Sequence, residues 1–316
     1  MRFTFLGTGT SAGIPCLGCT CDVCRSDDPR DTRLRCSAMV RFTDATGQPR
    51  VVLIDASPDL RQQLLREGVD RLDAIVFTHN HVDHTFGLDE VRRFNAIMKQ
   101  PIDIYAERPV LDSLRRVYKH VFDQKSNVQP SFVATLIAHE IEPGRPLDLF
   151  GVRFTPIRLL HGRLPILGYR IEPVPGGSDR SLALPARKGA TREVGGVASG
   201  RPGGGAANAA AGDETSPPPS NNAPPWWPLA WCTDCSAVPP ETWADLNGLG
   251  TLCLDALRHR NHPTHFTLGQ AVGVAHRVEA QQTLFIHMAH DLGHAETEAE
   301  LPDGMKLGYD GLTLGE

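Results

Sequence analysis

Long hydrophobic runs are missing from this 316-residue sequence. No stretch approaches the roughly 18 consecutive apolar residues that a membrane-spanning helix requires, so we expect no membrane association. The opening residues, MRFTFLGTGTS, also lack the apolar segment of a secretory signal peptide. We therefore expect a cytoplasmic protein that is long enough to bury a hydrophobic core without disulfide bonds.

An excess of positive charge is also missing. The sequence has 32 lysines and arginines against 37 aspartates and glutamates, which gives a formal net charge of −5. Without a general basic field, the chain is a poor candidate for binding a large polyanion such as nucleic acid. A small anionic substrate, held by metal ions or by a few local cations, is compatible with this balance.

Large apolar residues are scarce over residues 173–228, where Gly, Ala, Pro and Ser dominate and no helical or strand period survives. Such a segment cannot bury enough surface to offset the entropy lost on ordering, so we predict a disordered insertion there. It is either a surface loop extension or an arm that binds a partner through Trp226 and Trp227.

On both sides of this insertion, short β-rich runs alternate with helical patterns. We predict strands at residues 2–7, 37–43, 50–56, 74–79, 102–106, 152–160, 167–172, 229–234, 251–257 and 283–288. We predict helices at residues 57–68, 87–100, 109–122 and 267–280. This order predicts an α/β protein with two sheets and outer helices, formed by one domain over residues 1–172 and 229–316.

Cysteines are concentrated near the start of the chain, where four of the eight lie in CLGCTCDVC, residues 16–24. The residues alone allow a disulfide, a redox pair, a catalytic thiol or a metal site. In a reducing compartment structural disulfides are rare, and clustered cysteines more often bind metal or do redox chemistry. We interpret the other four as buried, unreactive thiols: Cys36, Cys232, Cys235 and Cys253.

Histidines gather in the segment FTHNHVDHTFGLDE, residues 77–90, which follows a buried-strand pattern. His79, His81, Asp83 and His84 therefore lie on a strand-to-helix connection, and they are ligands that borderline divalent metals prefer. In an extended stretch His79 and His81 face the same way. Turning into the helix aims Asp83 and His84 elsewhere, so this one segment can serve two metal ions.

Three more residues of ligand type stand where apolar strands end, which is where α/β sheets present their sites. His161 ends the strand in PIRLLHG, Asp234 follows LAWCT, and His287 follows TLFI. Nearby loops contribute further candidates: Arg258, His265 and His290.

This ordered set resembles the metallo-β-lactamase superfamily, as do FLGTGTSAGIP at residues 5–15 and LIDASPD at residues 53–59. The resemblance covers nearly the whole chain outside the insertion, and it implies a four-layer αβ/βα sandwich with a dinuclear metal site between the sheets. It also implies two ligand sets joined by a bridging Asp234: His79, His81 and His161 for one metal, and Asp83, His84 and His287 for the other. Two divalent ions, Zn or Mn, would share and activate a hydroxide and neutralise charge on a phosphoryl oxygen.

The cysteines indicate which family within this superfamily the sequence resembles most. GCTCDVC, followed much later by HMAH, is similar to the PhnP-type phosphoribosyl 1,2-cyclic phosphate phosphodiesterases of phosphonate breakdown. In that family three cysteines and one histidine bind a structural zinc. The resemblance assigns this role to Cys19, Cys21, Cys24 and His290, a ligand set typical of structural zinc. It leaves Cys16 without a role.

The resemblance therefore implies a metal-dependent phosphodiesterase that hydrolyses a small cyclic phosphate diester, such as 5-phosphoribosyl 1,2-cyclic phosphate. A histidine at the position of His265 protonates the departing oxygen in that family, and Asp83 and Asp234 complete the catalytic set. A histidine that caps a helix or lies on the surface is the alternative for His265. Arg258 is a candidate phosphate contact.

Other functions of the same fold stay open at this point. A tRNA 3′-processing nuclease would need a basic surface, and a hydrolase of lactones, esters or thioesters would direct the same hydroxide to a carbonyl. An accessory protein of quinone-cofactor biosynthesis has a similar cysteine-rich start, but the complete set of metal positions argues against it. We expect a small phosphodiester as the partner, disfavour nucleic acid and leave a homodimer open.

Overall fold

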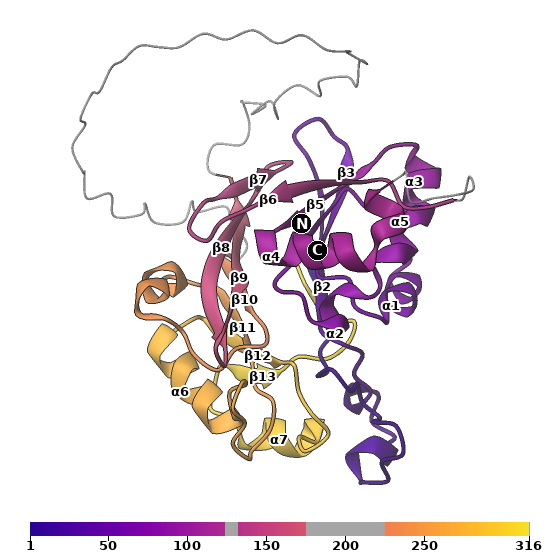
Figure 1. Ribbon diagram of the computed structural model, residues 1–316. Coiled ribbons are helices and arrows are strands. Elements are labelled where there is room, and N and C mark those ends of the chain that lie inside the picture. Colours follow the sequence, from indigo (N-terminus) through magenta and orange to yellow (C-terminus); the bar gives the residue numbers. More distant parts are fainter. Residues whose placement is uncertain (124–131, 175–224, 316) are drawn as a thin grey trace, which may run out of the picture.

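Two seven-stranded sheets face each other in the computed structural model, which describes residues 1–123, 132–174 and 225–315. Helices cover the outer face of each sheet (Figure 1). This arrangement confirms the predicted αβ/βα sandwich. Most of the predicted insertion, residues 175–224, lies outside the described residues.

The first sheet has the strand order β14-β1-β2-β3-β4-β5-β6. Its strands are β1 (Arg2–Gly7), β2 (Ser37–Thr43), β3 (Pro49–Ile54), β4 (Ala74–Val76), β5 (Ile102–Ala106), β6 (Leu136–Glu140) and β14 (Thr313–Leu314). The helices of this half are α1 (Leu60–Arg66), α2 (Val82–Thr85), α3 (Arg92–Met98), α4 (Arg108–Val117) and α5 (Lys119–Phe122). Short 3₁₀ turns occur at η1 (Val23–Arg25), η2 (Pro29–Asp31) and η3 (Leu88–Val91). Because β3 to β6 are parallel, their carboxyl ends meet at one edge.

The second sheet has the order β13-β12-β11-β10-β9-β8-β7. Its strands are β7 (Leu147–Leu149), β8 (Val152–His161), β9 (Leu164–Pro173), β10 (Leu229–Cys232), β11 (Thr251–Asp255), β12 (Gln282–Ile286) and β13 (Met305–Leu307). Its outer face carries η5 (Pro240–Leu246), α6 (Leu268–Val278) and α7 (His294–Glu300). The strands β10 to β13 are parallel, so their carboxyl ends also share one edge.

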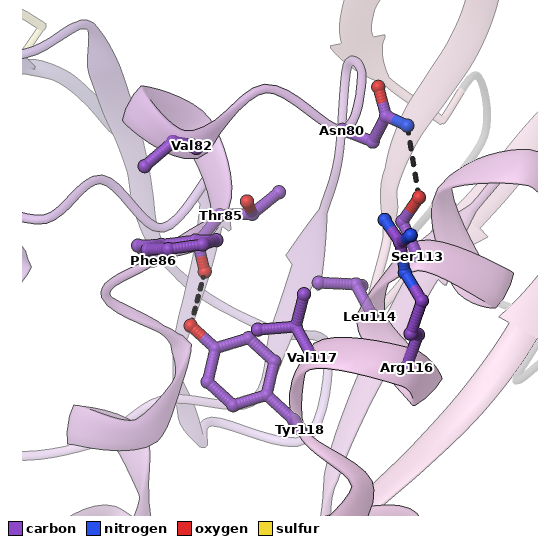
Figure 2. A pocket seen from close by; sticks show the side chains of 9 residues that line it. All are labelled: Asn80, Val82, Thr85, Phe86, Ser113, Leu114, Arg116, Val117 and Tyr118. Carbon is purple, nitrogen blue, oxygen red and sulfur yellow. Dashed lines mark hydrogen bonds between the residues drawn. The ribbon is translucent and has the colours of Figure 1, made fainter.

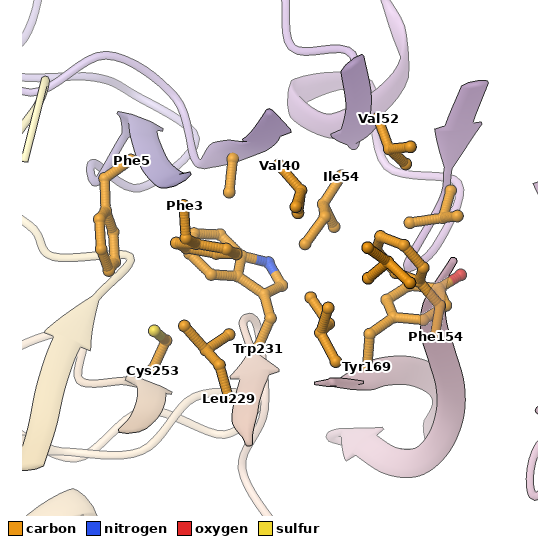
Figure 3. Close-up of a cluster of buried hydrophobic side chains, with 14 of the residues drawn as sticks. Phe3, Phe5, Val40, Val52, Ile54, Phe154, Tyr169, Leu229, Trp231 and Cys253 are labelled. Atoms are coloured by element: carbon orange, nitrogen blue, oxygen red, sulfur yellow. The ribbon is translucent and has the colours of Figure 1, made fainter. Parts of the chain in front are cut away.

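The core lies between the sheets, and period-two alternation directs side chains into it. In β3, Val52 and Ile54 belong to this central cluster, whereas Val51 and Leu53 pack under the outer helices. Figure 3 shows Ile54 and Phe3 of the first sheet facing Trp231 of the second. Burial of these apolar side chains stabilises the sandwich and fixes the relative position of the two sheets.

Both ends of the predicted insertion belong to the folded domain, which corrects the boundary at residues 173–228. Pro173 pairs with Val152 at the end of β9. Trp226 and Trp227, taken from sequence as possible partner anchors, are only 8% and 4% exposed and lie in the central core. Two indole rings bury a large apolar area, so packing them inside is more favourable than leaving them exposed.

The carboxyl-end loops of both sheets converge, and these loops carry the predicted metal ligands.

No helix in the described ranges is long and apolar enough to cross a membrane.

Candidate metal centre

The histidine segment lies on a connection between a strand and a helix, as predicted from the sequence. After β4, the chain turns through His79 and His81 into α2, whose single turn contains Asp83 and His84. The ring of His81 lies 4.6 Å from that of His79 and 5.0 Å from that of His161, measured between centroids. The three imidazoles expected to hold one metal are therefore brought together from two sheets.

Asp234 occupies the middle of the site. Its Oδ1 lies 3.0 Å from Nε2 of His287, and its Oδ2 lies 3.1 Å from Nε2 of His84. His79 Nε2 is 4.0 Å from Oδ1. Four residues each place one ligand atom within 4.8 Å of the ligand atoms of the other three: Asp83, His84, Asp234 and His287. Both carboxylate oxygens of Asp234 thus face imidazole nitrogens of the second ligand set, and Oδ1 also faces His79 of the first set at a longer distance.

The residues fit divalent metal ions. Nε2 of His79, of His84 and of His287 is buried without a hydrogen bond of normal geometry, despite the short contacts of the latter two with Asp234. Buried polar atoms are almost always hydrogen-bonded. A cation among them would satisfy all three lone pairs and the charge of Asp234. Imidazole and carboxylate ligands suit Zn and Mn.

A second layer of hydrogen bonds fixes the ring orientations. Asp55 Oδ2 is 2.8 Å from His84 Nδ1 and accepts a bond of 2.8 Å from the Thr78 hydroxyl. Because the Thr78 hydroxyl donates its only proton to Asp55, it acts as the acceptor toward His79, whose Nδ1 donates to Thr78 Oγ1 at 3.0 Å. His161 Nδ1 donates to the carbonyl of Thr264 at 2.8 Å. With Nδ1 engaged in each ring, Nε2 is left for the metal.

Three residues at the site adopt left-handed backbone conformations that are uncommon outside glycine. They are Asp55, Asp234 and His287, with φ of 63°, 55° and 59°. Asp55 and His287 directly follow the last residue of a strand, and Asp234 follows the end of β10 by one further residue. Such strain persists where surrounding contacts fix the chain, often at functional sites.

Burial and charge shift the titration of this cluster in opposite directions. Burial lowers the pKa of His79 well below its usual range and that of His161 to about 4, so both are neutral imidazoles with a free lone pair at neutral pH. Although burial disfavours the charged ring of His287, the Asp234 carboxylate raises its pKa to about 10. Conversely, despite burial, the charges of His287 and His84 hold the pKa of Asp234 well below its usual range. Protons and metal ions therefore compete for the same nitrogens.

His265 lies beside the same centre and is 8% exposed. Its ring is 4.5 Å from that of His161 and stacks on His287 at 4.8 Å between centroids. Its Nδ1 is 2.7 Å from Oδ2 of Asp255, a fully buried carboxyl at the end of β11. The N-cap of α6 is instead Thr267, so the helix-capping alternative for His265 is wrong.

The sequence analysis missed Asp255 and gave Asp55 no role. In both cases the sequence contained the same signal that indicated Asp234, an acidic residue where an apolar strand ends. Asp55 directly follows such a strand, and Asp255 is the last residue of another.

Three further basic residues, Arg163, Arg258 and His262, lie on loops that adjoin candidate site residues. Arg258 donates from Nε to the carbonyl of Arg260 and from Nη2 to that of Asn261, both at 3.3 Å, so its guanidinium shapes its own loop. The ring of His262 lies 5.0 Å from that of His265. Arg163 sits in the two-residue turn directly after His161.

The cysteine cluster forms a second centre. The sulfur atoms of Cys19, Cys21 and Cys24 lie 3.2, 3.3 and 3.6 Å from His290 Nδ1, and all four ligand atoms lie within 4.8 Å of one another. None of the eight cysteines is in a disulfide. The Cys16 thiol donates to the carbonyl of Gly13 at 3.1 Å, while its amide donates to the Cys24 sulfur at 3.3 Å. Cys16 is thus a backbone donor to the cluster.

Only two residues separate His287 from His290, so the two centres share one loop. Arg33, which is fully buried, donates to the carbonyls of Ala289 and Leu292 at 3.3 and 2.7 Å. This contact holds the shared loop against the segment that follows the cysteine cluster.

A cavity of about 140 Å³ lies behind the histidine segment, between α2 and α4. Figure 2 shows Asn80 pointing to Ser113, with 3.0 Å between amide nitrogen and hydroxyl oxygen. It also shows the Tyr118 hydroxyl directed at the carbonyl of Thr85, a bond of 2.9 Å. These contacts tie the ligand segment to α4 from the side opposite the metal ligands.

Comparison with known families is consistent with this geometry. A model described as a beta-lactamase superfamily domain matches residues 50–183 and 227–288, more than half of the chain. The chain belongs to the metallo-β-lactamase superfamily. A solved structure described as a new diphosphatase from the PhnP family is 34% identical, with a TM-score of 0.75 over 100% of this chain and 97% of that one. It confirms the resemblance to PhnP-type proteins.

More distant structures share the fold alone. Zn²⁺-bound PqqB from Methylobacterium extorquens gives a TM-score of 0.66 at 19% identity, with full coverage of both chains. The short form of human tRNase Z gives 0.60 at 16% identity, covering 100% of this chain and 99% of that one.

Curated relatives carry different names. An octanoyltransferase from Porphyromonas gingivalis is 33% identical over 314 residues, which are 99% of this chain and 51% of the relative. Coenzyme PQQ synthesis protein B from Methylobacterium radiotolerans is 29% identical over 185 residues, 56% of this chain and 53% of the relative. The chain spans about half the length of these relatives, so their named activities do not transfer to it.

Proposed function

We propose that this protein is a metal-dependent phosphodiesterase that hydrolyses a small cyclic phosphate diester, 5-phosphoribosyl 1,2-cyclic phosphate being the first candidate. The observation that carries the proposal is the His265–Asp255 pair placed directly against the candidate metal ligands, at 2.7 Å between Nδ1 and Oδ2. The similarity to a PhnP-family diphosphatase supports phosphorus rather than carbon as the centre attacked.

Two ligand sets would hold the metal ions: His79, His81 and His161 in one, Asp83, His84 and His287 in the other, with Asp234 between them. Divalent ions there, Zn or Mn, would supply a water of lowered pKa and neutralise negative charge on a phosphoryl oxygen. The thiols of Cys19, Cys21 and Cys24 with His290 would hold a structural zinc.

The role of His265 is to deliver a proton to the departing oxygen. The contact between Nδ1 and Asp255 fixes the ring, which leaves Nε2 as the nitrogen able to hold that proton. Burial lowers the pKa of His265 to about 4. A phosphate anion bound at the centre acts in the opposite direction, since a nearby negative charge favours the imidazolium.

The His265→Ala variant is expected to hydrolyse an alkyl phosphodiester about 10²–10⁴-fold more slowly, whereas its rate on a nitrophenyl diester changes little. The alkoxide is a poor leaving group that needs the proton, and nitrophenolate departs without it. Steady-state rates on the two substrates, measured with fully metal-loaded enzyme, give the comparison.

His262→Ala is the matched control, because His262 lies on the same loop and its ring contacts His265. It should reduce both rates by a similar, smaller factor. Equal losses on both substrates for His265→Ala would contradict the general-acid role.

A further inference from the structure

A hydroxyl and a thiol lie directly behind Asp234. Thr233 is fully buried and Cys36 is 1% exposed. The Thr233 Oγ1 atom is 2.6 Å from Oδ2 of Asp234 and 3.4 Å from the sulfur of Cys36. Neither side chain is in either set of candidate ligands, and both were interpreted from sequence as ordinary interior residues or left without a role.

Counting protons fixes the direction of these bonds. A threonine hydroxyl has one proton to donate, and a carboxylate at 2.6 Å is a stronger and closer acceptor than a sulfur at 3.4 Å. Thr233 therefore donates to Asp234, and in that arrangement its oxygen is free to accept from the Cys36 thiol 3.4 Å away. Burial, together with the nearby Asp234 carboxylate, raises the pKa of Cys36 well above its usual range, so the thiol keeps its proton.

This relay crosses from one sheet to the other at the metal centre. Cys36 immediately precedes β2 in the first sheet, and Thr233 immediately follows β10 in the second. Ser37, the residue after Cys36, donates from its hydroxyl to the carbonyls of Ile54 and Asp55 at 3.0 and 3.2 Å. The start of β2 thus supports the neighbourhoods of both strained carboxylates, Asp55 and Asp234.

Asp234 needs such support. Its left-handed backbone, with φ of 55°, is strained for a residue other than glycine. Its two oxygens must also face His84 and His287 from opposite sides at 3.1 and 3.0 Å. The Thr233 bond restrains rotation of the carboxylate and leaves a lone pair of each oxygen directed at the centre.

We propose that Thr233 and Cys36 are positioning residues that orient the Asp234 carboxylate and thereby set the affinity of the centre for metal ions. The inference rests on the metal centre of the proposed function but not on its substrate. It is therefore tested by metal binding, so a wrong substrate assignment would leave its test intact.

The test compares Thr233→Val with Thr233→Ser by competitive titration of Co²⁺ against a chelator in the full chain. The cysteine cluster serves as an internal reference, since cobalt bound by thiolates has a charge-transfer absorption that cobalt bound by His and Asp lacks. Thr233→Val, which keeps the shape, should weaken the His/Asp centre about 10–100-fold and leave the thiolate band unchanged. Thr233→Ser should bind cobalt like the natural protein.

Wild-type affinity in Thr233→Val would overturn the proposal, and so would equal losses in Thr233→Val and Thr233→Ser. If Thr233→Val does not fold, Cys36→Ala and Cys36→Ser provide the same contrast at the first donor. Serine keeps a donor and should preserve affinity, whereas alanine should weaken it. Identical affinity in these two variants would remove Cys36 from the relay.

Discussion

The Asp234→Asn variant is expected to lose its active-site metal ions and more than about 100-fold of its activity, because even residues that only support metal ligands are worth about 10–100-fold. Each oxygen of Asp234 faces a different imidazole at close range, Oδ2 that of His84 at 3.1 Å and Oδ1 that of His287 at 3.0 Å. An amide removes the negative charge and turns one acceptor into a donor directed at those imidazoles. Metal content by elemental analysis and the rate on a phosphodiester measure both effects.

Asp73→Asn is the control for general destabilisation. Asp73 is also a buried carboxylate, and it pairs with Arg50 and Arg71 and accepts from the amide of Val51, outside the site. This variant should lower the thermal midpoint and still bind its full complement of metal. Full metal occupancy in Asp234→Asn, with activity near that of the natural protein, would contradict the central position of Asp234.

The Cys24→Ser variant is expected to lose the structural zinc that we propose for the cysteine cluster and to unfold at a lower temperature. Structural zinc binding is worth roughly 10 kcal/mol or more where folding depends on it entirely, and only part of that is at stake in a large domain. We expect the free energy of unfolding to fall by a few kcal/mol. Because each kcal/mol shifts the thermal midpoint by about 2–4 °C, the midpoint should fall by roughly 5–15 °C. Because His290 shares a loop with His287, we also expect reduced activity. Calorimetry and zinc analysis measure the outcome.

Cys16→Ser is the matched control in the same loop. The contribution of Cys16 to the cluster is its backbone amide, which donates to the Cys24 sulfur and survives the substitution. This variant should keep the zinc and the thermal midpoint of the natural protein. A loss of zinc equal to that of Cys24→Ser would show that the Cys16 thiol is itself a ligand.

Strands with clear alternation could be predicted from sequence, and edge strands could not. The prediction of a strand at residues 50–56 agrees with β3 except at its end, where Asp55 leaves the sheet in a left-handed conformation. The four edge strands of the two sheets, β6, β7, β13 and β14, were missed. β6 lies at an edge with a partly exposed, irregular pattern, and β14 has only two residues. Edge strands bury little and therefore leave a weak periodic signal.

The candidate ligands could be found because they are chemically distinctive residues at the ends of apolar strands, as for His161 and Asp234. Their supporting partners Asp55 and Asp255 also stand at strand ends, but the sequence does not show which histidine each one contacts. The pairs Asp55–His84 and Asp255–His265 depend on contacts between segments 29 and 10 residues apart in the chain. A lone acid at a strand end has the same appearance in a sequence as a turn residue.

The most direct test of the account is one substrate panel, run with metal-loaded protein and with the same protein after chelation. The panel contains 5-phosphoribosyl 1,2-cyclic phosphate, simple phosphodiesters, a diphosphate, lactones, an acyl thioester and a precursor tRNA. We predict metal-dependent hydrolysis of the cyclic phosphate and slower hydrolysis of the simple diesters, with no comparable rate on the lactones, the thioester or the RNA. Preferential hydrolysis of a lactone, thioester or tRNA, or unchanged phosphodiester hydrolysis after chelation, would contradict the account.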